Sequence, residues 1–401
     1  MAEVDAEAKW PALDWEERNW TPKIPAEMVS ASVRKRHEGT YQSALVSPIA
    51  NCTPQFPSDI LSLAEEASVE IARFDAELGN EVAPFASVLL RSESASSSKI
   101  ENLTSGAKAI ALAELGSTAK RNATEIVGNV AAMRAALELA DRLDNHAILA
   151  MQRALIVQQD PSIAGRWRDE QVWIGGDSFG PHGAEFVPPH HEHIPTLMDD
   201  LVKFTGRTDL PLLSQAAIAH AQFETVHPFG DGNGRTGRAL IHAMFRGHGL
   251  TRNVTIPVSA GLLVDKTGYF ESLTAYREGD PASIVEKLAR ASFAAIANGR
   301  RLVLELRAIR EGWNQQIRAR RDASAWRLAD VLIRQPVVDA ATVATELDTP
   351  TKNVLRAVDP LVEAGVLTEF TGFARNRMWQ SSEVLTVLDA FAARAGRRGG
   401  A

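Results

Sequence analysis

The residues of this chain best suited to chemistry lie together in the run HPFGDGNGRTGR, residues 227–238. The run combines a histidine, a carboxylate, an asparagine and two arginines with glycines between them. A histidine titrates near neutral pH, as a general base should. A carboxylate beside phosphates is a usual ligand of Mg²⁺, and paired guanidinium groups suit a polyphosphate. The run could therefore accept a proton, hold a divalent metal and bind a nucleotide.

Two predicted helices must position this run. Residues 212–226 before it and 238–246 after it contain good helix formers and neither glycine nor proline. The glycines between them permit positive φ, so we expect a tight loop that ends at a helix N-terminus, where free N–H groups bind anions. Arg235 and Arg238 are three positions apart and share one face of the second helix. An ordinary glycine-rich loop between helices is the alternative, but it does not explain this set of residue types.

The run resembles the signature of the Fic family, HPFx[DE]GNGRxxR. Every fixed position of that signature is present: His227, Pro228, Phe229, Asp231, Gly232, Asn233, Gly234, Arg235 and Arg238. The resemblance implies a mainly α protein with a Fic helical core and a small β-hairpin flap. It also implies an enzyme, a protein adenylyltransferase that moves AMP from Mg-ATP to a Ser, Thr or Tyr hydroxyl of a target protein or of itself and releases pyrophosphate.

The resemblance also assigns roles to single residues. His227 would deprotonate the attacking hydroxyl, Asp231 would hold Mg²⁺, and Arg235 and Arg238 would hold the β and γ phosphates. Positioning and charge neutralisation would supply most of the catalysis. The expected nucleotide-binding residues are Gly232, Asn233, Gly234, Arg235, Thr236, Gly237, Arg238 and Tyr269.

A second motif, SSKIEN at residues 97–102, resembles the inhibitory motif [ST]xxxE[GN] of the same family. In the family this glutamate, here Glu101, pairs with the second arginine of the signature, here Arg238, and takes the place of the γ-phosphate. A serine-rich helix start at 94–98, capped by its hydroxyls, is the alternative interpretation, and both can hold. Because such a glutamate could also position water, removal of AMP from a modified target is kept as an alternative function.

Two further segments fit the resemblance less specifically. Residues 165–189 predict a β-hairpin, because apolar residues alternate over 171–174 and a short apolar stretch follows at 185–187. It resembles the family's flap, which clamps a target segment by strand pairing; a structural hairpin is the alternative. Tyr269 lies in a segment that resembles the one lining the adenine pocket, but an ordinary core aromatic on a helix explains it nearly as well.

The run HHEH at residues 190–193 invites a metal-site interpretation. Helical zinc ligands are usually four positions apart on one face, and adjacent side chains cannot all converge on one ion. We therefore expect the polar first turn of a helix here and no transition-metal site.

The composition limits the class of protein. Of the 401 residues 45% are hydrophobic, as in globular proteins, and the net charge of −7 gives no excess of positive charge for nucleic acid. The single cysteine, Cys52, excludes an internal disulfide. No secretion signal or membrane-spanning apolar run is visible, so we expect a cytoplasmic protein without a membrane partner.

The length predicts two or three domains. One long helix is expected from near Pro281 to Arg321, broken near Gly299 and Gly312. The expected order is an irregular N-terminal lead-in over 1–55 that packs its tryptophans on the core, a helical region with the inhibitory helix over 56–118, the Fic core over 119–300, a connecting helix over 301–323 and a winged helix-turn-helix over 324–395.

The C-terminal segment resembles a winged helix-turn-helix. We expect helices over 325–333, 340–347 and 351–364, then a two-stranded wing over 366–370 and 374–379. Outward-facing residues that could contact DNA are Thr351, Lys352, Asn353, Arg356, Arg375 and Arg377. Asp359 would repel phosphate, and Pro360 should kink or shorten the third helix. DNA binding and protein docking are both kept open.

Two classes of function result. The first is a self-inhibited enzyme that uses ATP and Mg²⁺, as a monomer or a homodimer. The second is a DNA-binding regulator whose Fic core senses a nucleotide without transferring it. The intact His227 favours the enzyme, because a sensor needs phosphate ligands but no base.

Overall fold

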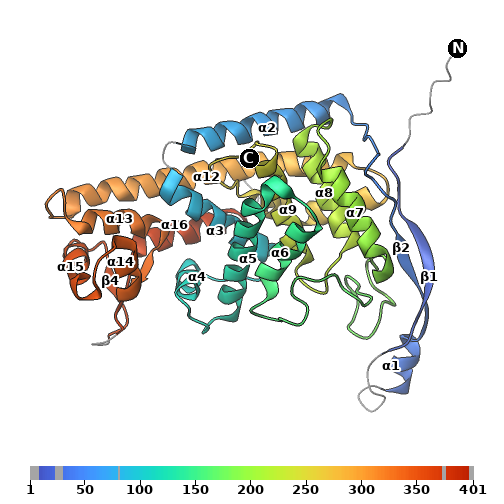
Figure 1. Cartoon of the computed structure of the whole chain (residues 1–401), viewed down its shortest axis with the longest axis horizontal. Coiled ribbons are helices and arrows are strands. Elements are labelled where there is room, and N and C mark those ends of the chain that lie inside the picture. The colour runs from blue at the N-terminus through green and yellow to red at the C-terminus, as the bar shows by residue number, and fades with distance from the viewer. Residues whose placement is uncertain (1–8, 23–29, 80–81, 373–375, 397–401) are drawn as a thin grey trace. The chain divides into compact units, whose positions relative to one another are not determined.

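The computed structural model describes residues 9–22, 30–79, 82–372 and 376–396 (Figure 1). Over these residues the chain is mainly helical and contains two small sheets, which confirms the expected helical class. The chain forms two compact units, each assembled from separate stretches of sequence. The first unit contains Met1–Glu65, Ala135–His248 and Thr267–Leu288, and the second contains Glu66–Arg134, Gly249–Lys266 and Ala289–Ala401.

Two packed helices form the centre of the first unit. They are α8 (Leu212–Val226) and α9 (Asn233–Gly247), with α7 (Ile194–Thr205) against α8 and α6 (Asn145–Ile156) against α9 (Figure 1). Helix α8 is buried from Leu213 to Val226, which explains why apolar residues occur on all its sides; the polar residues among them are buried as well. The two predicted helices around the signature are therefore confirmed.

The N-terminal lead-in is a β-hairpin, so the expected irregular structure is wrong for this segment. Strands β1 (Asp14–Trp20) and β2 (Gly39–Leu45) pair antiparallel, and the short helix α1 (Ala31–Arg36) lies between them in sequence. Trp10 is buried beside Tyr276, with ring centroids 6.0 Å apart, and Trp20 meets Trp173 edge-on at 5.3 Å. Trp15 meets the buried Phe186 ring edge-on at 6.3 Å, so all three tryptophans contact aromatic side chains, although Trp15 is 51% exposed.

Helix α3 (Val82–Ile100) is the central element of the second unit. It contacts α10 (Val258–Leu262), α13 (Ser324–Arg334) and α16 (Ser382–Arg394). Helix α4 (Ala107–Glu114) follows α3 in the chain and also contacts α16. The Ser94–Ser98 run lies inside α3, where Ser94 Oγ donates to the Leu90 carbonyl at 2.9 Å. The alternative of a serine-capped helix start is therefore wrong.

Three longer helices each contribute residues to both compact units. They are α2 (Ser58–Leu78), α5 (Arg121–Glu138) and α12 (Ala282–Gln316). Helix α12 is continuous through Gly299 and Gly312, so the expected breaks are wrong. A Cβ at Gly299 would lie 3.1 Å from the Phe74 ring, which indicates that this glycine serves close packing. The free-energy cost of a glycine in a helix is only about 1 kcal/mol, and packing outweighs it.

The C-terminal segment alternates helices with short strands. After α13 come β3 (Val337–Asp339), α14 (Ala340–Leu347), a 3₁₀ turn at Thr351–Asn353, α15 (Leu355–Glu363), β4 (Thr368–Glu369), β5 (Met378–Gln380) and α16. The sheet order is β3-β5-β4, all antiparallel. The expected two-stranded wing is thus a three-stranded sheet, because the short strand β3 was missed. Pro360 lies inside α15, which continues to Glu363.

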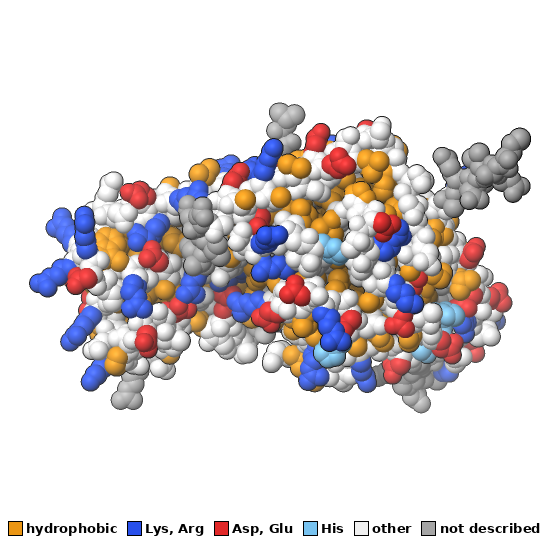
Figure 2. Space-filling view, turned by 45° about the horizontal axis from the view of Figure 1, so that its top comes forward, with side chains coloured by type: hydrophobic (Ala, Val, Ile, Leu, Met, Phe, Trp, Pro, Cys, Tyr) orange, Lys and Arg blue, Asp and Glu red, His pale blue; other side chains and the backbone are white. Residues whose placement is uncertain are grey.

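Basic and acidic side chains share the surface of this segment (Figure 2). Thr351, Lys352 and Arg356 are exposed as expected, but so are Asp359 and Glu363. In the sheet, Arg377 Nη2 pairs with Glu369 Oε2 at 2.9 Å, which lowers the pKa of that carboxyl. Asn353 is half-buried. Arg375, expected in the wing, lies outside the described residues.

Within the part of the chain that the structure describes, no helix has both the length and the apolar character needed to cross a membrane.

Candidate active site

His227 marks the end of α8 in an unusual backbone conformation. Its φ of 49° and ψ of 60° place it in the left-handed region, and its N–H donates to the Phe223 carbonyl at 2.8 Å. A residue with a Cβ pays about 1–2 kcal/mol for this conformation, so the surrounding structure must hold it. Its Nδ1 lies 3.9 Å from Glu224 Oε2 on the same helix.

Arg168 holds the backbone at His227. Its Nε donates to the His227 carbonyl at 2.9 Å, Nη1 to the Glu170 carbonyl at 2.8 Å and Nη2 to the Pro189 carbonyl at 2.6 Å. Its backbone N–H donates to the Pro228 carbonyl at 2.9 Å. The side chain is 7% exposed, and burial lowers the pKa of the guanidinium to about 10. Arg168 therefore joins the end of α8 to residues 168–189.

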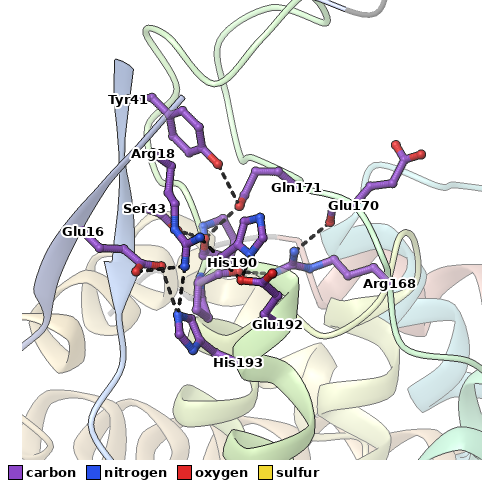
Figure 3. A network of polar contacts seen from close by, with 12 residues as sticks. Glu16, Arg18, Tyr41, Ser43, Arg168, Glu170, Gln171, His190, Glu192 and His193 are labelled. Carbon is purple, nitrogen blue, oxygen red and sulfur yellow. Dashed lines mark hydrogen bonds and ion pairs between the residues drawn. The ribbon is translucent and has the colours of Figure 1, made fainter. Parts of the chain in front are cut away.

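A wider network extends from Arg168 to the N-terminal hairpin (Figure 3). Gln171 Nε2 donates to the Pro188 carbonyl at 2.9 Å and Gln171 Oε1 accepts from the Tyr41 hydroxyl at 3.2 Å, while Ser43 Oγ donates to the Pro188 carbonyl at 3.0 Å. Residues 168–189 are thus held by contacts with the signature loop, residues 227–238, and with β2.

The HHEH run belongs to this network. His191–His193 form a 3₁₀ turn that leads into α7, so the expected first turn of the α-helix begins only at Ile194. His190 Nδ1 lies 3.1 Å from Glu192 Oε2, and His193 Nε2 lies 3.1 Å from Glu16 Oε1 of β1. Burial, followed by the neighbouring His191, lowers the pKa of His190. These side chains connect the hairpin to α7.

The loop itself is tied by Phe229 and Asn233. The Phe229 N–H donates to Asn233 Oδ1 at 2.9 Å, and Asn233 Nδ2 donates to the Phe229 carbonyl at 2.8 Å. The Phe229 ring is fully buried against Trp167, with centroids 5.0 Å apart. Both ends of the Asn233 amide are therefore engaged within the loop, so this side chain shapes the site.

Gly232 forms the N-cap of α9 at a position that needs glycine. Its φ is 85°, and a Cβ there would lie 2.7 Å from Leu155 Cδ2. The neighbouring Asp231 accepts from the Gly232 N–H at 2.6 Å through Oδ1, and its side chain is 57% exposed. An exposed carboxylate at a helix N-terminus fits the ligand that Mg²⁺ would require beside bound phosphates.

Arg235 has buried donors that no described residue satisfies. The side chain is 4% exposed, and its contact with Asp231 is long, with Nη2 3.4 Å from Oδ1. Within the described residues, Arg235 Nε and Nη1 are buried without a hydrogen-bond partner, and so is Thr236 Oγ1. An unsatisfied buried donor costs about 1–3 kcal/mol, and more when it is charged. The free N–H groups of α9 lie next to these donors in sequence, so an anion would satisfy both.

Other expected nucleotide-binding residues are more deeply placed. Arg238 is 2% exposed on α9. A Cβ on Gly237 would lie 2.9 Å from both Phe223 Cδ1 and Glu224 Oε1, so this glycine allows α8 and α9 to approach. Gly234 lies in the first turn of α9.

Tyr269 lies on α11 (Lys266–Arg277) and is 1% exposed. Its hydroxyl is 2.7 Å from His220 Nε2 on α8, and the two rings stack with centroids 5.9 Å apart. This position favours the alternative of a core aromatic over an adenine-stacking residue. Its neighbour Phe270 is 46% exposed.

The expected flap is shorter than a full hairpin. Ile174 and Phe186 form an antiparallel bridge, with Ile174 N–H to the Phe186 carbonyl at 2.8 Å and Glu185 N–H to the Ile174 carbonyl at 2.8 Å. Gly175 and Gly176 both have positive φ directly after the bridge, which ends regular pairing. The two apolar stretches do meet as predicted.

Glu101 follows the last residue of α3 and is exposed. Its N–H donates to the Ser98 carbonyl at 3.1 Å, and Asn102 reverses the chain with a φ of 62°. Glu101 belongs to the second compact unit and the signature loop to the first, so its pairing with Arg238 stays a prediction.

Sequence reasoning missed Arg168, Gln152 and Trp167 as parts of the site. Gln152 Nε2 donates to the Asp231 carbonyl at 3.2 Å, and Gln152 Oε1 accepts from the Gly165 N–H at 2.6 Å. Arg168 and Gln152 contact backbone atoms and Trp167 packs on the Phe229 ring, all at partners far away in the chain, so no residue spacing reveals these contacts. Trp167 and Arg168 lie in the segment 165–189, which the sequence indicated only as a hairpin.

Comparison with known proteins agrees with this geometry. The chain matches the Fic/DOC family over residues 142–245 and the Fic/DOC family N-terminal region over residues 61–138. Protein adenylyltransferase fic-1 of Caenorhabditis elegans is 32% identical over 181 residues, which cover 44% of this chain and 33% of that protein. A probable protein adenylyltransferase of Aquifex aeolicus is 34% identical over 109 residues, 27% of this chain and 31% of that protein.

A solved structure supports the fold over a longer stretch. A Fic family protein from Desulfovibrio desulfuricans G20 has a TM-score of 0.51 and 20% sequence identity, and the match covers 82% of this chain and 97% of that one. The chain spans about a third of the length of the curated relatives named above. Residues 61–138 and 142–245 of the chain, which include the intact signature loop, thus match the Fic/DOC family.

Proposed function

We propose that this protein is an adenylyltransferase that moves AMP from Mg-ATP to a Ser, Thr or Tyr hydroxyl of a target protein, and of itself. The observation that carries the proposal is the buried Arg235 guanidinium, whose Nε and Nη1 have no partner within the described residues. A buried charge without a partner costs free energy, and a bound anion removes that cost. A polyphosphate at the N-terminus of α9 would do so.

The remaining residues of the loop have matching roles in this proposal. The target hydroxyl attacks the α-phosphorus, its proton passes to the His227 imidazole, and the bond between the α and β phosphates breaks to release pyrophosphate. Asp231 would hold Mg²⁺, which neutralises the phosphates when bound. The Gly232 N-cap and the first N–H groups of α9 would bind phosphate oxygens, as would Gly234, Thr236 and Arg238. The names of the curated relatives, protein adenylyltransferases, support the same reaction.

Substitution of His227 tests the proposal. His227→Ala should lower the rate of AMP transfer from α-labelled ATP by about 100-fold or more, because a positioned general base contributes 10²–10⁴. ATP affinity, measured by calorimetry, should change by only a few-fold. His146→Ala is the matched control, since His146 is an exposed histidine in the first turn of α6. Transfer that survives His227→Ala would refute the base assignment.

We further propose that Glu101 inhibits the enzyme through Arg238. Glu101→Gly should then increase self-modification by labelled ATP, because the γ-phosphate no longer competes with a carboxylate. The double variant Glu101→Gly/His227→Ala should show no labelling, which separates transfer from nonspecific binding. Equal labelling of Glu101→Gly and the natural protein would remove the inhibitory role. Loss of label from a modified target that depends on Glu101 would instead favour AMP removal.

For the C-terminal segment we propose a winged helix-turn-helix. The element order helix, strand, helix, helix, strand, strand over α13 to β5 supports it. DNA binding is the second candidate function, favoured by the exposed Lys352 and Arg356 and opposed by Asp359 and Glu363 on the same helix. Since phosphate binding requires an excess of positive charge, we rank it below a protein contact.

A further inference from the structure

The second unit contains a cavity of about 210 Å³ beside α3, the helix that ends directly before Glu101. Its walls come from α3, the turn after α3, α4, α5 and α16, and we call it the α3–α16 cavity. An apolar cavity of about 150 Å³ holds a molecule of benzene, so this one can hold a somewhat larger organic molecule. None of the proposed nucleotide-binding residues lines it.

Several polar side chains of the wall lie at or just beyond the C-terminal end of α3. Lys99 and Ser96 are three positions apart and share one face of the helix, and Thr104 and Ser105 line the same cavity just beyond the helix end. Lys99 Nζ donates to the Ala392 carbonyl at 3.0 Å and, within the described residues, is paired with no carboxylate. This ammonium group has two further N–H donors.

The other charges of the wall are already engaged. Arg91 Nε donates to Glu114 Oε1 at 2.9 Å, so the charge of that arginine is balanced. Asp389 Oδ1 accepts from the Ala107 N–H at 2.8 Å at the start of α4. Lys99 is therefore the cation of this wall that has no carboxylate partner within the described residues, whereas the Asp389 carboxylate is held by a backbone N–H. Part of the wall is apolar, with Ile110, Ile126 and Phe391 among its lining residues.

We propose that the α3–α16 cavity binds a small organic acid, with its carboxylate at Lys99 and its apolar body against Ile110, Ile126 and Phe391. A carboxylate supplies the missing counter-ion and accepts from hydroxyl groups. The apolar body gains free energy from transfer out of water. A neutral or cationic ligand of the same shape would leave Lys99 unpaired.

A ligand in this cavity affects the inhibition by Glu101, an inference that rests on the proposed function. Helix α16 touches both ends of the segment 99–107, at Lys99 through the Ala392 carbonyl and at Ala107 through Asp389. Glu101 lies within that segment. If the segment 99–107 has two conformations, a ligand that binds one of them more tightly raises the population of that one. The acid thereby regulates the inhibition by Glu101.

Calorimetry on the full chain tests the binding site without any need for activity. Phenylacetate is the probe, and phenylacetamide is its neutral counterpart of the same shape. We expect saturable binding of phenylacetate, with at least tenfold weaker binding of the amide and of phenylacetate to Lys99→Met. Lys108→Met should bind as the natural protein does, because Lys108 lies outside the cavity, over the Phe370 ring. Ala95→Phe, which fills the cavity, should abolish binding.

Three results would overturn the site: no saturable binding of phenylacetate, equal binding of the amide, or unchanged binding to both Lys99→Met and Ala95→Phe. Thermal unfolding by circular dichroism establishes that each variant is folded, and Ala95→Phe decides the matter if Lys99→Met is not. Self-modification by labelled ATP then tests the regulation. We expect phenylacetate to change it at least threefold in the natural protein and not at all in Glu101→Gly. No change in either protein refutes the regulation, whereas absence of transfer throughout refutes the proposed function and leaves the calorimetric result standing.

Discussion

Two buried arginines, Arg168, which contacts the signature loop, and Arg235, which belongs to it, differ in how their donors are used. Arg168, 7% exposed, donates to three backbone carbonyls, including that of His227. Arg235, 4% exposed, reaches Asp231 only at 3.4 Å, and its Nε and Nη1 have no partner within the described residues. The residue type and the degree of burial are the same, so neither of them distinguishes a structural residue from a ligand-binding one.

The state of the hydrogen bonds makes that distinction. A guanidinium whose donors are satisfied by the chain stabilises the fold, and its removal leaves carbonyls unpaired. A guanidinium with unfilled donors destabilises the free protein, and the ligand recovers that cost on binding. Arg168 and Asn233 therefore hold the shape of the signature loop, and we call them its structural side. Arg235 and Asp231 are available to a ligand, and we call them its binding side.

The largest effect is expected at the binding side. Arg235→Met should lower ATP affinity by about 100-fold or more, because each charge-assisted hydrogen bond contributes about 1.5–3 kcal/mol. The free energy of unfolding should stay the same or rise, since an unsatisfied buried charge is removed. Calorimetry with ATP and Mg²⁺, together with urea unfolding, measures both quantities. Arg246→Met is the control, because Arg246 is exposed on the same helix. A large loss of stability in Arg235→Met would show that this arginine belongs to the structural side.

The opposite result is expected for Arg168. Arg168→Met leaves the carbonyls of His227, Glu170 and Pro189 without this donor, so the free energy of unfolding should fall by about 2–4 kcal/mol. At temperatures where the variant is folded, its ATP affinity should lie within a few-fold of the natural value. Transfer should fall further than binding does, because the position of His227 depends on this contact. If ATP affinity collapses while stability is unchanged, the contrast between the two arginines is false.

The sequence predicted the binding side of the loop better than the structural side. Phosphate and metal chemistry demands particular residue types at fixed spacing, so His227, Asp231 and Arg235 were recognisable in a single sequence. Arg168 and Gln152 contact backbone carbonyls, which every residue possesses, and their partners lie 59 and 79 positions away. No local pattern encodes such a pairing.

The fold shows the same division between local and distant causes. Helices α8 and α9 follow from helix formers on both sides of a glycine loop, and the structure confirms them. The N-terminal hairpin was missed because charged residues surround Trp15 and Trp20, which hides the apolar alternation of a strand. Gly299 lies within α12 and packs closely on Phe74, far away in the chain, so the glycine alone gave a wrong break.

The smallest effect, expected at Tyr269, tests whether a satisfied buried group can also bind nucleotide. Its hydroxyl is 2.7 Å from His220 Nε2. Tyr269→Phe should therefore lower the free energy of unfolding by about 1 kcal/mol, the usual net contribution of one hydrogen bond, and should change ATP affinity by less than about twofold. Urea unfolding and calorimetry again give the two numbers. A tenfold loss of ATP affinity with unchanged stability would place this hydroxyl on the binding side, and would mean that hydrogen bonding in the free protein does not identify the residues that bind nucleotide.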